Sequence, residues 1–145
     1  MDRRNIVKAT ALAGFGLLAA GRAQAEAARA SKVVYHLPDA EKVPFALGNL
    51  RNHIAGTGGP GAVRFAVVVH GPALRVFRLE GANLAVEQDI RDSIRDGVAF
   101  YACANTMAAL KLTLADLMPG FAVAEKGGVV LLADLQAQGW AYLRP

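Results

Sequence analysis

Three features of the sequence predict an α/β fold with three layers, in which helices cover both faces of a five-stranded, mostly parallel sheet. Short apolar segments alternate with amphipathic segments from residue 32 to the C-terminus. The joining turns are short, and several of the apolar segments are rich in β-branched residues. Such alternation is typical of right-handed crossovers between parallel strands. With five strands, we expect the flavodoxin-like order 2-1-3-4-5.

The first half of the domain contains two predicted strands separated by a helix. An apolar run predicts a strand over 32–37, and Asp39 is placed to cap the helix that follows. Apolar residues recur at helical spacing until the glycine-rich segment 56–61, which lacks the Lys-Ser/Thr pair of a phosphate-binding loop. Residues 63–70 are almost continuously apolar, which predicts a strand covered on both faces.

The second half continues the alternation, and only residues 73–79 receive no assignment. The predicted elements are a helix over 83–96, a strand over 98–102, one helix whose apolar face runs from Met107 to Leu117, a strand over 121–124, a helix over 129–138 and a strand over 140–143. Gly127-Gly128 opens the last of these helices, where close packing is a commoner reason for glycine than anion binding.

Residues 1–25 have the features of a secretory signal peptide. Two adjacent arginines precede an uncharged apolar run over 9–20, and Ala23-Gln24-Ala25 offers a cleavage site. The arginine pair resembles a twin-arginine signal, while an ordinary Sec leader or an uncleaved anchor remain alternatives. We expect a short disordered stretch over 26–31, a single domain over 32–145, and a periplasmic or otherwise exported location.

The charge of the mature domain argues against nucleic acid as a partner. The chain has 16 basic and 12 acidic residues. Four of the basic residues and one of the acidic residues belong to the leader, so the domain itself is nearly neutral. It contains no run of basic residues interleaved with aromatic ones. We therefore expect no nucleic acid partner, and no membrane association once the leader is removed.

Cys103 is the only cysteine, so it has no partner for an intrachain disulfide. Its alternatives are a buried inert thiol, an intermolecular bridge, a metal ligand or a reactive sulfur. The predicted position, where a strand passes into a helix, favours reactivity, because unpaired N–H groups at a helix N-terminus stabilise a thiolate. Asn105 or Thr106 is expected to cap that helix, and either could bind a sulfur species.

Two histidines are expected near this cysteine. His36 and His70 lie near the ends of the first two predicted strands, and the crevice of a parallel sheet lies at the carboxyl ends of its strands. The expected order makes the three strand ends adjacent. Two imidazoles and a thiolate would suit zinc or copper, but three such separated residues form no recognised metal motif, so we predict neither metal nor cofactor.

The chain resembles the DsrE/DsrF-like family over most of its mature length. The resemblance rests on the segment 41–52, on Val69-His70-Gly71-Pro72 and on the block 101–107. It implies a small α/β/α domain that assembles into dimers, trimers or hexamers, or with related chains. It also implies a persulfide carried on a cysteine after the third strand, a position that Cys103 occupies. The Arg-Gly pair that follows this cysteine in many cytoplasmic carriers is missing here.

Two functions therefore follow as expectations. The first is a periplasmic, thiol-dependent sulfur carrier or sulfurtransferase, in which Cys103 exchanges sulfane sulfur with donor and acceptor proteins. His36, His70, Asn105 and Thr106 would line its binding site. The second is a non-catalytic oligomeric protein that binds a small ligand or metal at the same crevice.

Overall fold

Five parallel strands form the central sheet of the computed structural model, which describes residues 31–145. The strands are β1 (Lys32–Leu37), β2 (Arg64–Val69), β3 (Ala99–Cys103), β4 (Phe121–Ala124) and β5 (Ala141–Leu143). All four neighbouring pairs are parallel, which confirms the predicted α/β fold class. The predicted signal peptide and the segment 26–30 lie outside the described residues.

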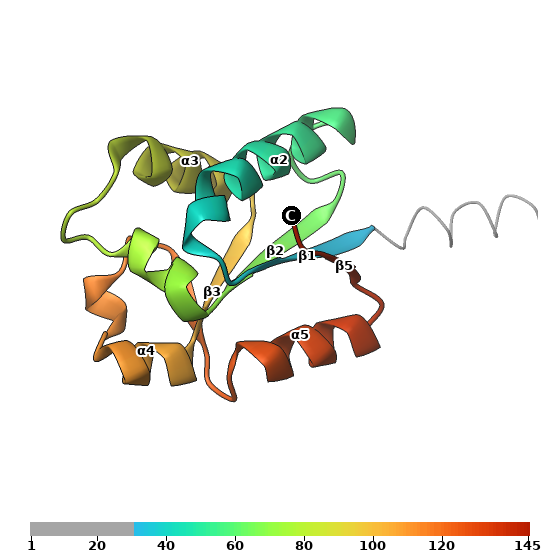
Figure 1. Ribbon diagram of the computed structural model, residues 1–145. Helices are drawn as coiled ribbons and strands as arrows, with labels where there is room; N and C mark the ends of the chain where they lie inside the picture. Colours follow the sequence, from blue (N-terminus) through green and yellow to red (C-terminus); the bar gives the residue numbers. More distant parts are fainter. Residues whose placement is uncertain (1–30) are drawn as a thin grey trace, which may run out of the picture. The chain divides into compact units, whose positions relative to one another are not determined.

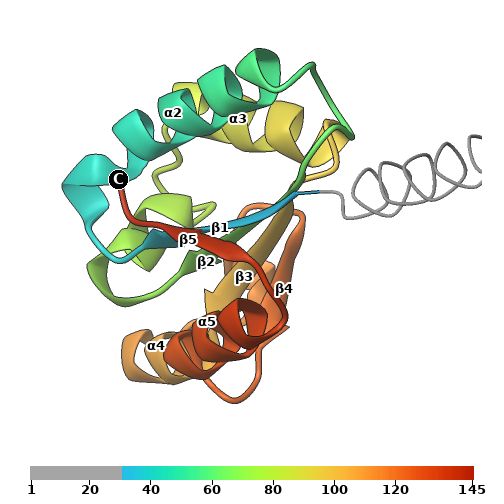
Figure 2. The same cartoon turned by 90° about the vertical axis from the view of Figure 1, so that its right-hand side faces the viewer.

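Helices cover both faces of the sheet and give the predicted three layers (Figures 1 and 2). On one side lie α2 (Val43–Gly56) and α3 (Leu84–Arg95), and on the other lie α4 (Ala104–Leu110) and α5 (Gly128–Ala137). Three short 3₁₀ helices, η1 (Ala40–Lys42), η2 (Gly71–Phe77) and η3 (Leu114–Asp116), lie in the connections. Among the residues that the structure describes, no helix is long and apolar enough to span a membrane.

The strands follow the order β4-β3-β2-β1-β5. In the expected order 2-1-3-4-5, the second strand is the edge strand next to the first. In the structure, β5 is the edge strand next to β1, and β2 lies between β1 and β3. The first four strands are sequential neighbours, and α5 then carries the chain across the opposite face to the free edge of β1 (Figure 2). The ends of β1, β2 and β3 remain adjacent in either order.

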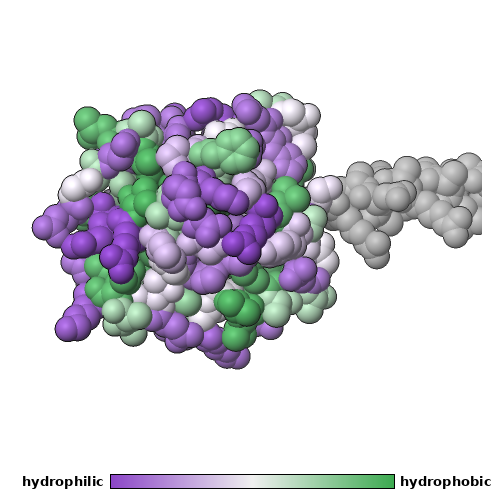
Figure 3. All heavy atoms as spheres, viewed as in Figure 1, coloured by the Kyte–Doolittle hydropathy of each residue, from purple (hydrophilic) through white to green (hydrophobic). Residues whose placement is uncertain are grey.

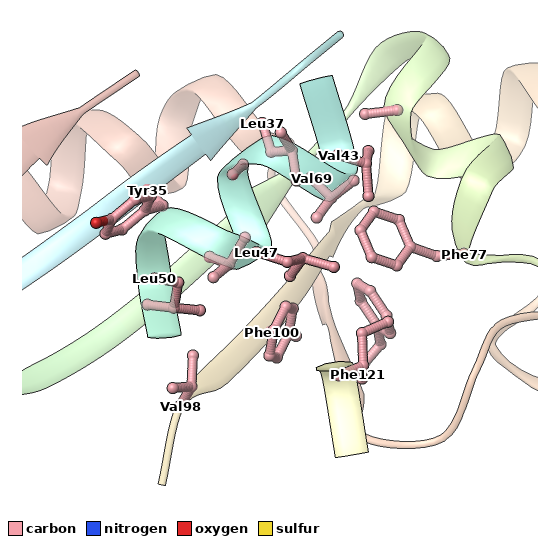
Figure 4. Packing of buried hydrophobic residues seen from close by; sticks show 14 of the residues in the cluster. Tyr35, Leu37, Val43, Leu47, Leu50, Val69, Phe77, Val98, Phe100 and Phe121 are labelled. Carbon is pink, nitrogen blue, oxygen red and sulfur yellow. The ribbon is translucent and has the colours of Figure 1, made fainter. Parts of the chain in front are cut away.

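The larger hydrophobic core lies between the sheet and the α2/α3 layer. Figure 4 shows Leu47 and Leu50 of α2 packed toward Phe100 of β3. Phe77 of η2 meets Phe121 of β4 edge-on, with ring centroids 5.3 Å apart. A smaller cluster joins the other face to α5 through Val34, Ala66, Val68, Leu132 and Leu135. Burying a side chain of this size stabilises the fold by about 1.5–3 kcal/mol, so the strands form a rigid support for their carboxyl ends.

The single helix expected from Met107 to Leu117 is wrong, because the chain turns sharply in its middle. α4 ends where Lys111 adopts a left-handed conformation (φ 55°), and the N–H of Leu112 donates to the carbonyl of Met107. Thr113 and Asp116 then form a capping box that starts η3. The helical spacing of the leucines was therefore misleading: the capping signal determines the backbone here.

The unassigned segment 73–79 falls mostly within η2. This 3₁₀ helix begins at Gly71, directly after β2 and His70, and it buries Ala73, Leu74 and Phe77. The chain thus leaves β2 into η2, whereas it leaves β3 into α4 on the α5 side of the sheet (Figure 1). The two connections diverge, so the ends of β2 and β3 mark a switch point of the kind at which parallel sheets bind ligands.

Candidate functional site

Cys103 is the last residue of β3 and the N-cap of α4, as its position in the sequence predicted. The residue is 5% exposed, yet neither of the two hydrophobic clusters includes it. The groups around it that favour negative charge on its sulfur are the backbone N–H groups of Gly128, Thr106 and Asn105 and the Thr106 hydroxyl. The thiol is therefore buried among polar donors.

These donors determine the acidity of the thiol. Burial raises the pKa of Cys103, because it disfavours the charged thiolate. The hydrogen bonds from Gly128, Thr106 and Asn105 favour the thiolate, and their combined effect holds the pKa of Cys103 below its ordinary value. A lowered pKa increases the fraction of nucleophilic thiolate at neutral pH.

Asn105 and Thr106 do not cap α4 as expected, because Cys103 occupies the cap position and no side chain caps the helix. Both lie in the first turn and donate to the sulfur through their N–H groups. The Thr106 hydroxyl also accepts from the N–H of Gly71 at 2.9 Å. The chain is thus linked from Gly71 through Thr106 to the Cys103 sulfur, which ties the end of β2 to the end of β3.

Gly128 contacts both Cys103 and His70. A Cβ atom at this position would lie 3.3 Å from the Cβ of Cys103, 3.3 Å from Val68 and 3.5 Å from the Cβ of His70. The start of α5 therefore approaches the sheet closely at this point, which agrees with the close-packing interpretation of Gly127-Gly128. The absence of a side chain allows the Gly128 N–H to reach the sulfur.

His36 and His70 lie against each other at the same edge. Their rings are stacked with centroids 4.7 Å apart and an interplanar angle of 13°, and their Nε2 atoms are 2.5 Å apart. The Tyr142 hydroxyl contacts Nδ1 of His36 at 2.6 Å. If one Nε2 atom carries a proton, it can donate to the other Nε2 atom. If both carried protons, two N–H groups would face each other without an acceptor.

The two imidazoles favour the neutral state. Burial lowers the pKa of His36 to about 4, helped by the neighbouring His70 and Arg144 and opposed by Asp39. Burial, again with Arg144, lowers the pKa of His70, and Asp39 again opposes the shift. At neutral pH the pair is therefore uncharged.

Sequence reasoning did not find Tyr142. It lies in β5, which the expected order placed at the far edge of the sheet, whereas β5 pairs with β1 and brings Tyr142 to His36. His53 of α2 also lies at hydrogen-bonding distance from a tyrosine, with its Nδ1 atom 3.0 Å from the Tyr35 hydroxyl. Within residues 31–145, no three His, Cys, Asp or Glu side chains are grouped to hold a metal ion.

The sequence of this chain matches a known protein family. Residues 25–145 match the DsrE/DsrF-like family. The chain belongs to this family. Membership supports a role related to sulfur relay. The matched residues include all five strands, from β1 to β5. No protein with a curated description matches the chain.

Solved structures share the DsrE/DsrF-like fold of this chain. The protein MTH1491 of Methanobacterium thermoautotrophicum, described as of unknown function, is 32% identical, with a TM-score of 0.69 over 79% of this chain and 99% of its own. The ychN protein of E. coli is 18% identical, with a TM-score of 0.61 over 79% and 99% of the two chains. BT1422 of Bacteroides thetaiotaomicron, a conserved protein of unknown function, is 15% identical, with a TM-score of 0.59 over 82% and 97%.

Replacing Thr106 by valine is expected to raise the pKa of Cys103, because the variant keeps the shape of the side chain but loses the hydroxyl that donates to the sulfur. The measurement is the rate of iodoacetamide alkylation as a function of pH, whose midpoint should move to higher pH. Thr106→Ser should restore the midpoint. An unchanged midpoint in Thr106→Val would show that the hydroxyl does not stabilise the thiolate.

Acidification is expected to destabilise the protein through His36. The pKa of His36 is about 4 in the folded chain and about 6.5 when unfolded, so the unfolded state binds more protons between these values. The free energy of unfolding should therefore fall as the pH is lowered from 6.5 to 4. Urea unfolding at several pH values measures it, and His36→Gln should show a shallower fall than the wild type. Equal slopes would contradict the assigned shift.

Proposed function

We propose that this protein is an exported carrier of sulfane sulfur, which it holds as a persulfide on Cys103. The family gives the coarser role, related to sulfur relay. The single observation that supports the finer one is the set of donors around the Cys103 sulfur, from Gly128, Thr106 and Asn105. Donors placed in this way stabilise negative charge on the Cys103 sulfur, in the thiolate that accepts sulfur and in the thiolate that leaves when sulfur is passed on.

The proposed reaction needs no external oxidant or reductant. The Cys103 thiolate attacks the sulfane sulfur of a donor, and a new S–S bond forms. The S–S bond of the donor breaks, and the remaining group leaves with the electron pair. An acceptor thiolate then attacks the outer sulfur of the persulfide, and Cys103 leaves as a thiolate. The same donors stabilise Cys103 at the start and at the end of the cycle.

The neighbouring side chains are proposed to bind the sulfur compound. Neutral His36 and His70 offer nitrogen atoms without adding charge, and Gly128 places His70 beside Cys103. Asn105 is exposed and Thr106 partly so, at the start of α4, where both would face an incoming donor. Export is proposed from the signal-peptide features of residues 1–25, and assembly with itself or related chains is proposed from the family.

The test is sulfur loading of the reduced protein. Polysulfide is added, excess reagent is removed, and the intact mass is measured. The wild type should gain one or more sulfur atoms, and cyanide or a thiol should release them. Cys103→Ser, which keeps the size of the side chain, should gain none.

The opposite result would support the alternative function. If the wild type gains no sulfur, or if Cys103→Ser gains as much, Cys103 is not the carrier. Slow alkylation of Cys103 under native conditions, together with a small ligand or metal retained through purification, would then identify a non-catalytic binding protein.

A further inference from the structure

Two adjoining pockets lie between η2 and α4, on the far side of Thr106 from the Cys103 sulfur. The first has a volume of about 320 Å³ and is lined by Gly71, Pro72, Arg75, Asn105, Thr106, Ala109 and Leu110. The second, of about 290 Å³, shares Arg75, Ala109 and Leu110 with it and adds Arg78, Lys111 and Leu112. Thr106 lines the first pocket and also donates to the Cys103 sulfur, so one side chain separates the pocket from the thiol.

All the charged residues that line these pockets are basic. Three cations, Arg75, Arg78 and Lys111, line them, and no acidic residue does. Arg78 is paired with Glu80 at 2.6 Å, whereas within residues 31–145 neither Arg75 nor Lys111 has a carboxylate partner. Two uncompensated positive charges therefore face a small space, which suits a dianion. Hydrophilic side chains also gather where η2 and α4 end (Figures 1 and 3).

Two details of the backbone and side chains of this wall concern its basic residues. Lys111 has a left-handed backbone, a conformation that favours glycine, and among residues 31–145 it is the only non-glycine residue with positive φ. The Nε atom of Arg78 is buried without a hydrogen-bond partner among those residues. Lys111 takes this conformation as the C-cap of α4, which places its cation at the second pocket. The Arg78 Nε atom is enclosed by protein, so an anion in the pocket would meet other atoms of the guanidinium.

We propose that these pockets bind a small dianionic sulfane-sulfur donor, with thiosulfate as the simplest example. This rests on the proposed function of Cys103 and names the class of donor. Arg75 would hold the anionic end, and Lys111 would add positive charge from the adjoining pocket. The outer sulfur would lie against Asn105 and Thr106, the residues between the first pocket and Cys103. With thiosulfate, the thiolate attacks the outer sulfur, the S–S bond breaks, and sulfite leaves with the electron pair. The products are the Cys103 persulfide and sulfite.

Binding is measured separately from reaction. Sodium thiosulfate is titrated calorimetrically into the full chain carrying Cys103→Ser, at constant ionic strength. Adding Arg75→Gln should weaken binding about tenfold, a loss of about 1.4 kcal/mol, because it removes a charge-assisted hydrogen bond. Lys111→Gln should weaken it several-fold. Arg51→Gln is the control, since Arg51 is an exposed arginine of α2 that lines neither pocket, and it should change nothing.

Reaction is then measured with two donors in the chain that keeps Cys103. Arg75→Gln should slow persulfide formation from thiosulfate about tenfold and leave the rate with an uncharged organic trisulfide unchanged. Equal binding in Arg75→Gln and Arg51→Gln overturns the anion site, even if the trisulfide still loads Cys103. If thiosulfate binds through Arg75 but neither donor loads Cys103, the persulfide function fails while the anion site stands.

Discussion

The contact between the Gly128 backbone and the Cys103 side chain holds the site together. Gly128 begins α5 and Cys103 ends β3, and the N–H of Gly128 favours negative charge on the sulfur. A side chain at 128 would press on Cys103, Val68 and His70. The larger core holds β3 and the α5 cluster holds α5, so both sides of this contact are fixed by packing.

Two different environments meet at this sulfur. On one side, His36 and His70 are stacked, and burial keeps them neutral. On the other side, Thr106 separates the sulfur from pockets lined by Arg75 and Lys111. An anionic donor would thus be attracted from the cationic side, while the two imidazoles are neutral and the nearby Arg144 is paired with Asp39. This division of charge is what a carrier needs, since it must both load and release sulfur.

Much of the fold could be predicted from the sequence because strand and helix signals are local. The strand at 32–37 and the position of Cys103 follow from short apolar runs and their ends. The strand order could not be predicted, since nothing local to residues 141–143 indicates that they pair with β1 instead of an outer strand. Tyr142 was missed for that reason. The helix predicted as far as Leu117 failed because the Thr113–Asp116 capping box outweighs the leucine spacing.

Some residues of the candidate site could also be predicted from the sequence, and others could not. Cys103, His36 and His70 could be chosen because each lies at a strand end, and the structure brings all three to one edge of the sheet. Arg75 could not be chosen from the sequence, because η2 has no clear sequence signal. The pocket that Arg75 lines forms only when η2 packs beside α4. Likewise, the donors to the sulfur are mainly backbone N–H groups, which every residue but proline possesses. Only their placement in space distinguishes them.

The central claim is that the folded protein holds the Cys103 sulfur as a stabilised anion. It is tested most directly by titrating the ultraviolet absorbance of the thiolate with pH, taking the difference between the wild type and Cys103→Ser. We expect a midpoint clearly below the ordinary cysteine pKa of about 8.5. A midpoint at or above that value would mean that burial outweighs the surrounding donors, and it would contradict the account.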